Sequence, residues 1–252
     1  MPRILITGCS SGFGLAIAQR FLTEGWEVVA TMRNTGQDVL PAHDRLTVLP
    51  VDVTDADSVA AAVAQAGPLD ALVNNAGVGL LNVLEGATME NMRAVFETNT
   101  LGAIALMKAV MPQFRSRGAG TIVNVSSSVT VKPLPALAAY TASKAALNAF
   151  SESFALEAAQ VGVRVRLVLP GSSPSTSFAP NAMARMGLEI PEPYEAFVMG
   201  YLGELRGAAE VTVPEDVAQA VWRAVTEPDT PMKTPAGADA VSWFKEAGLP
   251  AA

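Results

Sequence analysis

Tyr140 and Lys144 are the two side chains whose types and spacing best suit acid–base chemistry in this sequence. They lie four residues apart, so on a helix they share one face, one turn from each other. A cation beside a phenol favours the phenolate, which lowers the pKa of a tyrosine from about 10 toward the range of a working general acid or base. Helices also carry such pairs by chance. Together with Ser127 upstream and a glycine loop at the front of the chain, the pair becomes strong evidence for acid–base chemistry at this helix.

That glycine loop has the form of a phosphate-binding turn. It reads Gly8-x3-Gly12-x-Gly14 and lies between an expected strand, Ile4–Thr7, and an expected helix, Gly14–Glu24. Glycines permit a tight turn and a close approach of backbone, and the first N–H groups of a helix attract a pyrophosphate. The alternative is an ordinary glycine-rich turn. The predicted dinucleotide contacts of the loop are Gly8, Ser10, Ser11, Gly12, Phe13 and Gly14.

The end of the second expected strand indicates which dinucleotide binds. A carboxylate there holds a ribose 2′-hydroxyl, whereas an arginine accommodates a 2′-phosphate. The strand ends Ala30-Thr31-Met32-Arg33, without a carboxylate. We therefore predict that Arg33 selects NADP(H), with NAD(H) as the possible second cofactor. The alternative is that Arg33 is a solvated surface charge.

Two further strand ends are expected to border the same cofactor. Asp52-Val53 follows the third strand, where a carboxylate can accept a hydrogen bond from an adenine amino group or, alternatively, close a turn. Asn75, Ala76 and Gly77 follow the fourth strand and are predicted to line the cofactor cleft. Asn74, just before them, is as well explained by a structural role, because its amide can bridge the backbones of adjacent strands.

Composition narrows the class of protein. The chain has 252 residues, of which 50% are hydrophobic, and a mean hydropathy of +0.31, which suits a parallel sheet buried on both faces. A net charge of −7 argues against a nucleic-acid partner. Cys9 and His43 are the only residues of their types, which disfavours a metal site and a Ser-His-Asp hydrolase. With no signal peptide and no membrane span expected, these counts favour a cytoplasmic, metal-free enzyme.

Strands and helices alternate along the chain. The expected strands are Ile4–Thr7, Glu27–Thr31, Leu46–Val51, Ala71–Val73, Thr121–Ser126, Arg164–Leu169 and Met232–Thr234. The expected helices are Gly14–Glu24, Asp55–Ala66, Met89–Arg117 with a break near Thr98–Thr100, Leu137–Gln160, Tyr194–Arg206 and Pro214–Thr226. This order predicts an α/β fold, a Rossmann-type doubly wound parallel sheet of about seven strands with helices on both faces. We expect one domain, 1–252, with a substrate lid at about 172–212.

These motifs, in this order, resemble the classical short-chain dehydrogenase/reductase family over nearly the whole chain. The matching positions are the loop Thr7–Gly14, Asn74–Gly77, Asn99, Ser127, Tyr140-x3-Lys144 and Pro170-Gly171. Ser127 precedes Tyr140 by 13 residues, as in the family pattern. The resemblance implies that Tyr140 is the proton donor or acceptor and that Lys144 lowers its pKa and holds the nicotinamide ribose. It further implies that Ser127 orients the substrate oxygen and that Asn99 anchors a water in the proton relay.

One segment departs from the family pattern. The family places a threonine five residues after the proline, where it binds the carboxamide of the cofactor, but Ser175 stands at that position here and Thr176 follows. Either or both are candidates for this contact. Pro170 and Gly171 remain predicted cofactor neighbours.

The substrate is expected to be apolar. The loop and second-strand residues are similar to those of NADP(H)-using hydroxysteroid and retinol dehydrogenases, and the lid is rich in apolar side chains such as Phe178, Met183, Met186, Leu188 and Phe197. We predict a medium-sized ketone or alcohol as substrate, and by resemblance a homodimer or homotetramer formed through Leu101–Arg115 and Leu137–Gln160. The alternatives are an NAD-dependent alcohol dehydrogenase, an epimerase or dehydratase of nucleotide sugars, and a non-catalytic dinucleotide-binding regulator.

Overall fold

A parallel sheet of seven strands is the centre of the computed structural model, which describes residues 1–36, 39–176, 178, 180, 182, 190–207 and 209–250. The strands are β1 (Arg3–Thr7), β2 (Glu27–Met32), β3 (Leu46–Pro50), β4 (Ala71–Asn74), β5 (Gly120–Val125), β6 (Val163–Pro170) and β7 (Lys233–Ala236). They pair in the order β3-β2-β1-β4-β5-β6-β7, and every neighbouring pair is parallel. The predicted Rossmann-type α/β fold is therefore confirmed.

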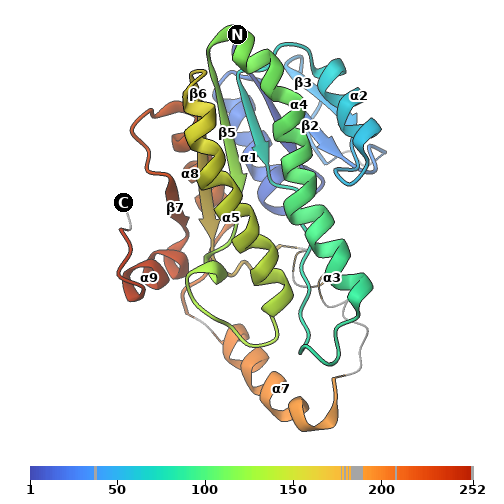
Figure 1. Ribbon diagram of the computed structural model, residues 1–252, viewed down its shortest axis with the longest axis vertical. Helices are drawn as coiled ribbons and strands as arrows, with labels where there is room; N and C mark the ends of the chain where they lie inside the picture. Colours follow the sequence, from blue (N-terminus) through green and yellow to red (C-terminus); the bar gives the residue numbers. More distant parts are fainter. Residues whose placement is uncertain are drawn as a thin grey trace.

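Helices cover both faces of this sheet. They are α1 (Gly12–Thr23), α2 (Ala56–Ala66), α3 (Met89–Phe96), α4 (Gly102–Arg117), α5 (Ala138–Ala159), α7 (Glu192–Arg206), α8 (Pro214–Thr226) and α9 (Ala238–Glu246), with a π-helix η1 (Glu97–Leu101) and a 3-10 turn η2 (Ser128–Thr130). In Figure 1, α4 and α5 lie in front of the sheet and α1 and α8 behind it, while α7 stands beyond one end. That end is where the strands finish.

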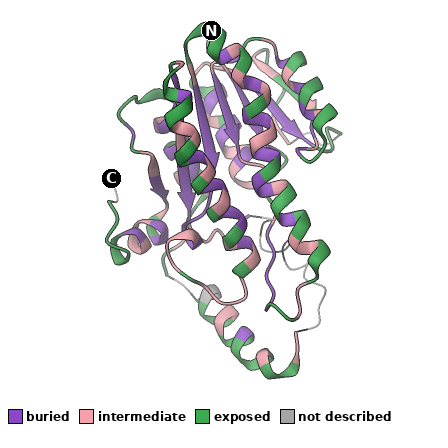
Figure 2. Ribbon diagram, viewed as in Figure 1, coloured by how far each residue is buried: buried purple, intermediate pink, exposed green. Residues whose placement is uncertain are grey.

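Alternation along the strands divides the core into two halves. Ile4 and Ile6 of β1 pack on the side of α1 and α8, whereas Leu5 between them packs on the side of α2, α4 and α5. Successive side chains of a strand point to opposite faces, so a strand covered on both faces must be apolar throughout. The strands accordingly form the buried centre of the molecule in Figure 2. This explains why half of the chain is hydrophobic.

The long helical run Met89–Arg117 is interrupted at the predicted place. The π-helix Glu97–Leu101 joins α3 to α4 and contains Asn99, the centre of the predicted break at Thr98–Thr100. A π-helix inserts an extra residue into a helix and is frequent at functional sites. By length and composition alone this run is also apolar enough to cross a membrane, and 44% of its most apolar window is buried within the protein.

The structure adds a helix that the sequence pattern did not predict. Helix α9 follows β7, and its Phe244 is buried against Leu167 and Leu169 of β6. Phe244 thereby completes the core of its own chain, because β6 would otherwise leave an apolar surface uncovered.

A buried carboxylate joins both ends of the lid segment, 172–212, to α9. Asp239 is 4% exposed, and its Oδ2 accepts a hydrogen bond of 2.6 Å from the backbone N–H of Ser172. The hydroxyl of Thr212 lies 2.7 Å from the other carboxylate oxygen, and the N–H of Thr212 donates to the carbonyl of Ser172. A Cβ at Gly171 would lie 2.1 Å from the same carboxylate, so this close approach requires glycine. The two ends of the lid are thus held at one point.

Asp239→Ala tests this anchor. We expect the free energy of unfolding to fall by about 2–4 kcal/mol, because two hydrogen bonds to a charged group are lost and a buried N–H is left without a partner. Urea unfolding at constant slope measures the loss. Asp44→Ala, at an exposed position, is the control and should change stability by about 0.5 kcal/mol or less. Equal stability of the two variants would contradict the role given to Asp239.

Candidate active site

A cleft of about 810 Å³ opens where the strands end, at the point of the sheet where the chain reverses its winding between β1 and β4. Ligands bind at such switch points in open α/β sheets. Most of the predicted site residues line this cleft: Gly8, Ser10, Ser11, Gly12, Phe13, Arg33, Asp52, Val53, Asn75, Ala76, Gly77, Ser127, Tyr140, Lys144, Pro170, Gly171 and Thr176. The predicted residues Gly14, Asn99 and Ser175 do not line it.

The glycine loop is packed against the segment after β4. A Cβ at Gly8 would lie 2.9 Å from the Cα of Ala76, and one at Gly14 would lie 2.2 Å from the carbonyl oxygen of Gly8. The side-chain amide of Asn75 donates to the carbonyls of Thr7 and Gly8, at 2.8 and 3.2 Å. Gly14 therefore contributes to the site by permitting the tight turn, and Asn75 by holding the loop.

The amino terminus of α1 is available to an anion. Its N-cap, Ser11, makes no hydrogen bond from its side chain to the helix. By contrast, Asp55 caps α2 and Thr88 caps α3 through their side-chain oxygens. The first N–H groups of a helix need partners, and uncapped ones at a glycine loop attract phosphate. These residues fit the pyrophosphate of a dinucleotide.

Arg33 and Asp52 lie at the same end of the cleft, at the ends of β2 and β3. Arg33 is exposed, and among the described residues no hydrogen bond or ion pair within 4.0 Å holds its guanidinium. The Asp52 carboxylate accepts bonds from the Thr54 N–H and hydroxyl at 2.9 and 2.7 Å. The pKa of Asp52 is lowered chiefly by these Thr54 bonds and further by the Arg33 charge. Asp52 thus closes a turn, one of the two roles considered for it.

Asn74 has the structural role. Its side-chain nitrogen donates to the side-chain oxygen of Asn124 at 2.8 Å and to the carbonyl of Ala103 at 3.3 Å. It therefore links β4, β5 and α4 beneath the cleft rather than lining it.

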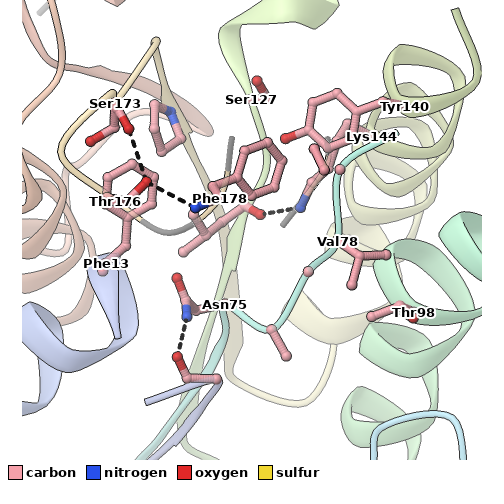
Figure 3. Close-up of a pocket in the computed structure, with 18 of the residues that line it drawn as sticks. Phe13, Asn75, Val78, Thr98, Ser127, Tyr140, Lys144, Ser173, Thr176 and Phe178 are labelled. Carbon is pink, nitrogen blue, oxygen red and sulfur yellow. Dashed lines mark hydrogen bonds between the residues drawn. The ribbon is translucent and has the colours of Figure 1, made fainter. Parts of the chain in front are cut away.

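Ser127, Tyr140 and Lys144 converge at the other end of the cleft. Figure 3 shows these three side chains together at this end of the cleft, and a side-chain hydrogen bond joins the phenol of Tyr140 to Ser127. All three are buried. The ammonium of Lys144 donates to the carbonyl of Val125 at 2.9 Å. Helix α5 supplies the phenol and the ammonium, and the turn after β5 supplies the second hydroxyl.

The pKa of Tyr140 differs from the sequence-based expectation. Burial raises it from 10.0 to about 12, and the hydrogen bond with Ser127 opposes this in part. Burial also lowers the pKa of Lys144, to about 8. The expected lowering by Lys144 does not appear, because both groups are removed from water, which disfavours the phenolate and the ammonium alike.

Asn99 lies behind the cleft and holds one of its walls. Its side-chain oxygen accepts from the N–H of Val78 at 2.8 Å, and its nitrogen donates to the carbonyl of Val78 at 2.9 Å and to the hydroxyl of Ser143 at 3.0 Å. A Cβ at Gly77 would lie 3.2 Å from the same side-chain oxygen. The amide of Asn99 is thus occupied by protein groups, and its expected role toward a water stays a prediction.

Thr176, not Ser175, faces the cleft. A Cβ added at Gly12 would lie 3.3 Å from the Cγ2 atom of Thr176, so the Thr176 side chain lies next to the glycine loop. Its hydroxyl donates to the carbonyl of Ser173 at 2.9 Å, which ties the residue into the turn after β6. Of the two candidates for the carboxamide contact, Thr176 lines the cleft and Ser175 does not.

Several further residues line the cleft: Phe178 and Tyr201 belong to the predicted lid segment, 172–212, whereas Leu134, Leu137 and Trp243 were not predicted. The ring of Phe178 lies 5.4 Å from that of Tyr140, centroid to centroid. Tyr201 from α7 and Trp243 from α9 also line the cleft, with Leu134 and Leu137 from the segment before α5. Their apolar character was visible in the sequence, but their approach depends on how distant segments fold over the strand ends. The expected lid residues Met183, Met186 and Leu188 lie outside the described residues.

Comparison with known proteins agrees with this geometry. The sequence pattern of the family described as short chain dehydrogenase matches residues 2–185. Retinol dehydrogenase 8 of Homo sapiens is 35% identical over 92% of this chain and 80% of its own length. The 3-ketodihydrosphingosine reductase of Bacteroides thetaiotaomicron is 34% identical over 93% of this chain and 87% of its own.

Solved structures of similar chains have the same fold. A short-chain dehydrogenase from Streptomyces avermitilis superposes with a TM-score of 0.84 at 32% identity, covering 97% of this chain and 91% of its own. A 3-ketoacyl-(acyl-carrier-protein) reductase from Brucella melitensis in complex with NADH gives 0.75 at 27% identity, covering 90% and 91%. A short chain dehydrogenase from Burkholderia cenocepacia in complex with NADP gives 0.79 at 27%, covering 98% and 92%. The chain therefore belongs to the short-chain dehydrogenase/reductase family and is an NAD(P)-dependent dehydrogenase or reductase.

Proposed function

We propose that this protein is an NADP(H)-dependent oxidoreductase that interconverts a medium-sized, apolar ketone or aldehyde and the corresponding alcohol. The observation that carries the proposal is the pairing of the Ser127 and Tyr140 hydroxyls at a cleft whose other end is the uncapped start of α1. One end suits a pyrophosphate and the other suits a substrate oxygen.

The roles of the protein side chains follow from their chemistry. Ser127 and Tyr140 donate hydrogen bonds to the substrate oxygen, on which negative charge grows during reduction, and Tyr140 supplies the proton. The bound nicotinamide supplies the hydride. Lys144 is buried beside this pair and keeps a positive charge near the developing oxyanion. Asn99 fixes the Val78 wall, against which the cofactor is held.

Arg33 supports the preference for NADP(H). It is an exposed cation that lines the cleft, and it directly follows β2, whose last residues, Ala30-Thr31-Met32, include no carboxylate. Ser10 and Ser11 line the same region and add hydroxyl donors. A 2′-phosphate is recognised by such a combination of an arginine and hydroxyl groups.

The lining of the catalytic end supports an apolar substrate. The ring of Phe178 lies beside that of Tyr140, and further apolar side chains from separate segments line the cleft: Leu81, Val129, Leu134, Leu137, Leu202 and Trp243. Within the described residues the charged side chains of the cleft are Arg33, Asp52, Glu97 and Lys144. Apart from Lys144, none of the described cations of the cleft is therefore available near Tyr140 to bind an acidic substrate. Two relatives act, by their names, on retinol and on a ketosphingosine, both of which have long apolar parts.

The proposal also covers the cellular location and the assembly of the enzyme. We place it in the cytoplasm as a homo-oligomer, without a membrane span or a nucleic-acid partner. Leu101 at the start of α4 and Leu156 on α5 are 50% and 73% exposed, which supports α4 and α5 as the faces between subunits. The net charge of −7 supports the absence of a nucleic-acid partner.

Tyr140→Phe is the first test of the mechanism. We expect kcat for NADPH-dependent reduction of apolar ketones to fall by about 10²–10⁴-fold, because the proton donor is lost. The affinity for NADPH, measured by fluorescence titration, should change little. Tyr194→Phe, at a tyrosine of α7 that does not line the cleft, is the matched control and should retain activity. Full activity of Tyr140→Phe would refute the mechanism.

Arg33→Ala tests the cofactor preference. Loss of a charged hydrogen bond to the 2′-phosphate should lower the ratio of kcat/KM for NADPH to that for NADH by about 10–100-fold. Arg115→Ala, at an exposed arginine near the far end of α4, is the control. If wild-type protein prefers NADH, or if the two variants give the same ratio, Arg33 does not select the cofactor.

The raised pKa of Tyr140 predicts a reduction rate that does not depend on pH near neutrality and an oxidation rate that rises with pH. With a pKa of about 12 the phenol stays protonated near neutrality, so the acid for carbonyl reduction is always present. Alcohol oxidation needs the phenolate, so its kcat should rise about tenfold per pH unit between about pH 6 and 7.5. Over that range Lys144, with a pKa of about 8, remains largely charged. A reduction rate that falls as pH rises in this range would show that cofactor binding brings the pKa of Tyr140 down to near neutrality.

A further inference from the structure

A buried amide lies one turn beyond Lys144 on the catalytic helix. Asn148 follows Lys144 by four residues and Tyr140 by eight, so it continues the same face of α5 away from the cleft. It is 7% exposed and does not line the cleft. The reaction as described so far gives it no role.

Both ends of this amide hold the turn that carries Ser127. The side-chain oxygen of Asn148 accepts from the hydroxyl of Ser126 at 2.5 Å. The side-chain nitrogen donates to the hydroxyl of Thr130 at 3.0 Å. The Thr130 hydroxyl in turn donates to the carbonyl of Ser127 at 2.8 Å. Ser127 is therefore fixed through the residue before it and through the residue three positions after it.

The donor and the acceptor of each hydrogen bond in this network are fixed by the groups that take part. Ser126 must donate to Asn148, because its partner is the amide oxygen. Thr130 accepts from the amide nitrogen, so its own proton is free for the Ser127 carbonyl. A side chain must both accept and donate to complete this chain, which an amide does and a carboxylate or an aliphatic group does not. Ser126 is 4% exposed, so water cannot readily replace the lost partner.

The position of the Ser127 hydroxyl matters to the phenol it faces. The hydrogen bond with Ser127 is the interaction that opposes the raising of the Tyr140 pKa by burial. The other groups around the phenol are Lys144 from the same helix, which donates to Val125, and the uncharged ring of Phe178 from the lid side. Displacing Ser127 would thus remove the stabilisation of the phenolate that comes from outside α5.

We propose that Asn148 is a positioning residue, which holds the Ser127 hydroxyl against Tyr140 by tying the turn after β5 to the catalytic helix. Asn148 touches neither substrate nor cofactor and acts only through Ser126, Thr130 and Ser127. The inference rests on the proposed function, in which Ser127 and Tyr140 together bind the substrate oxygen.

The test is a double-mutant cycle between Asn148→Ala and Ser127→Ala, measured as NADPH-dependent ketone reduction and as alcohol oxidation across pH. We expect Ser127→Ala to lower kcat by about 10²-fold or more, since it removes a donor to the oxyanion. Asn148→Ala should lower kcat about tenfold through misplacement of that donor. The double variant should be no slower than Ser127→Ala alone. Both single variants should displace the alcohol-oxidation profile toward higher pH, with NADPH affinity unchanged.

Two further variants separate positioning from general loss of stability. Thr130→Val breaks the same chain at a half-buried position without emptying the core, and should reproduce the effects of Asn148→Ala even if that variant folds poorly. Ser151→Ala is the control, because Ser151 is buried on the same helix and accepts from Asn124 at 2.8 Å without contacting the Ser127 turn. It should lose stability but keep kcat and the pH profile.

The outcomes distinguish this inference from the proposed function. Additive effects of Asn148→Ala and Ser127→Ala, or an unchanged pH profile in both Asn148→Ala and Thr130→Val, would overturn the role of Asn148 while leaving the oxidoreductase intact. Effects of Ser151→Ala equal to those of Asn148→Ala would also overturn it. A wild-type protein that turns over none of the carbonyls and alcohols would overturn the proposed function, and this inference with it.

Discussion

The parallel pairing of β1 with β4 is the contact on which the rest of the structure depends. Chains on either side of this pair wind away in opposite directions, so the segments that leave the two strand ends separate and leave a space between them. The hydroxyl of Thr7 accepts from the N–H groups of Asn75 and Ala76, both at 3.0 Å, which joins the two segments at their base. Side chains larger than hydrogen at Gly8 or Gly14 would force them apart. The position of the cleft is thus a property of backbone packing, and the catalytic groups are added to it.

Burial is the main cause of the pKa shifts of Tyr140 and Lys144 at the catalytic end of the cleft. Tyr140 and Lys144 are both nearly inaccessible to water, which raises the pKa of the phenol and lowers that of the ammonium. Each shift favours the neutral form of its group, so the cleft holds a phenol that keeps its proton and a lysine whose pKa, about 8, still leaves it largely charged near neutrality. Burying such groups costs free energy, and a site built to react tolerates this cost. A positive charge brought in by a ligand would then act on Tyr140 at a low dielectric, where it is most effective.

The sequence predicted the fold, and most of the residues predicted for the site line the cleft, whereas the packing at the substrate end was predicted less completely. The alternation of strands and helices and the break near Thr98–Thr100 follow from local patterns that need only neighbouring residues. The direction of the Tyr140 pKa shift was wrong, because it depends on burial and not on the four-residue spacing. Trp243 reaches the cleft from a segment far beyond Tyr140 in the sequence, and no local pattern reports such a contact. Whether Asn74 or Asn75 faces the cleft was likewise decided by the strand end and not by residue type.

The regular spacing of residues along helix α5 sets the positions of the polar groups at the catalytic end of the cleft. At successive four-residue steps it presents the phenol of Tyr140, the ammonium of Lys144 and the amide of Asn148. Each of these meets a different part of one short stretch of chain: Ser127, the carbonyl of Val125 and the hydroxyl of Ser126. A shift of α5 along β5 would break all three contacts together, so none of them can be adjusted alone. The geometry of the reacting hydroxyls is therefore set by the packing of one helix against one strand end, and the polar contacts that run behind the cleft belong to the catalytic apparatus as much as those that line it.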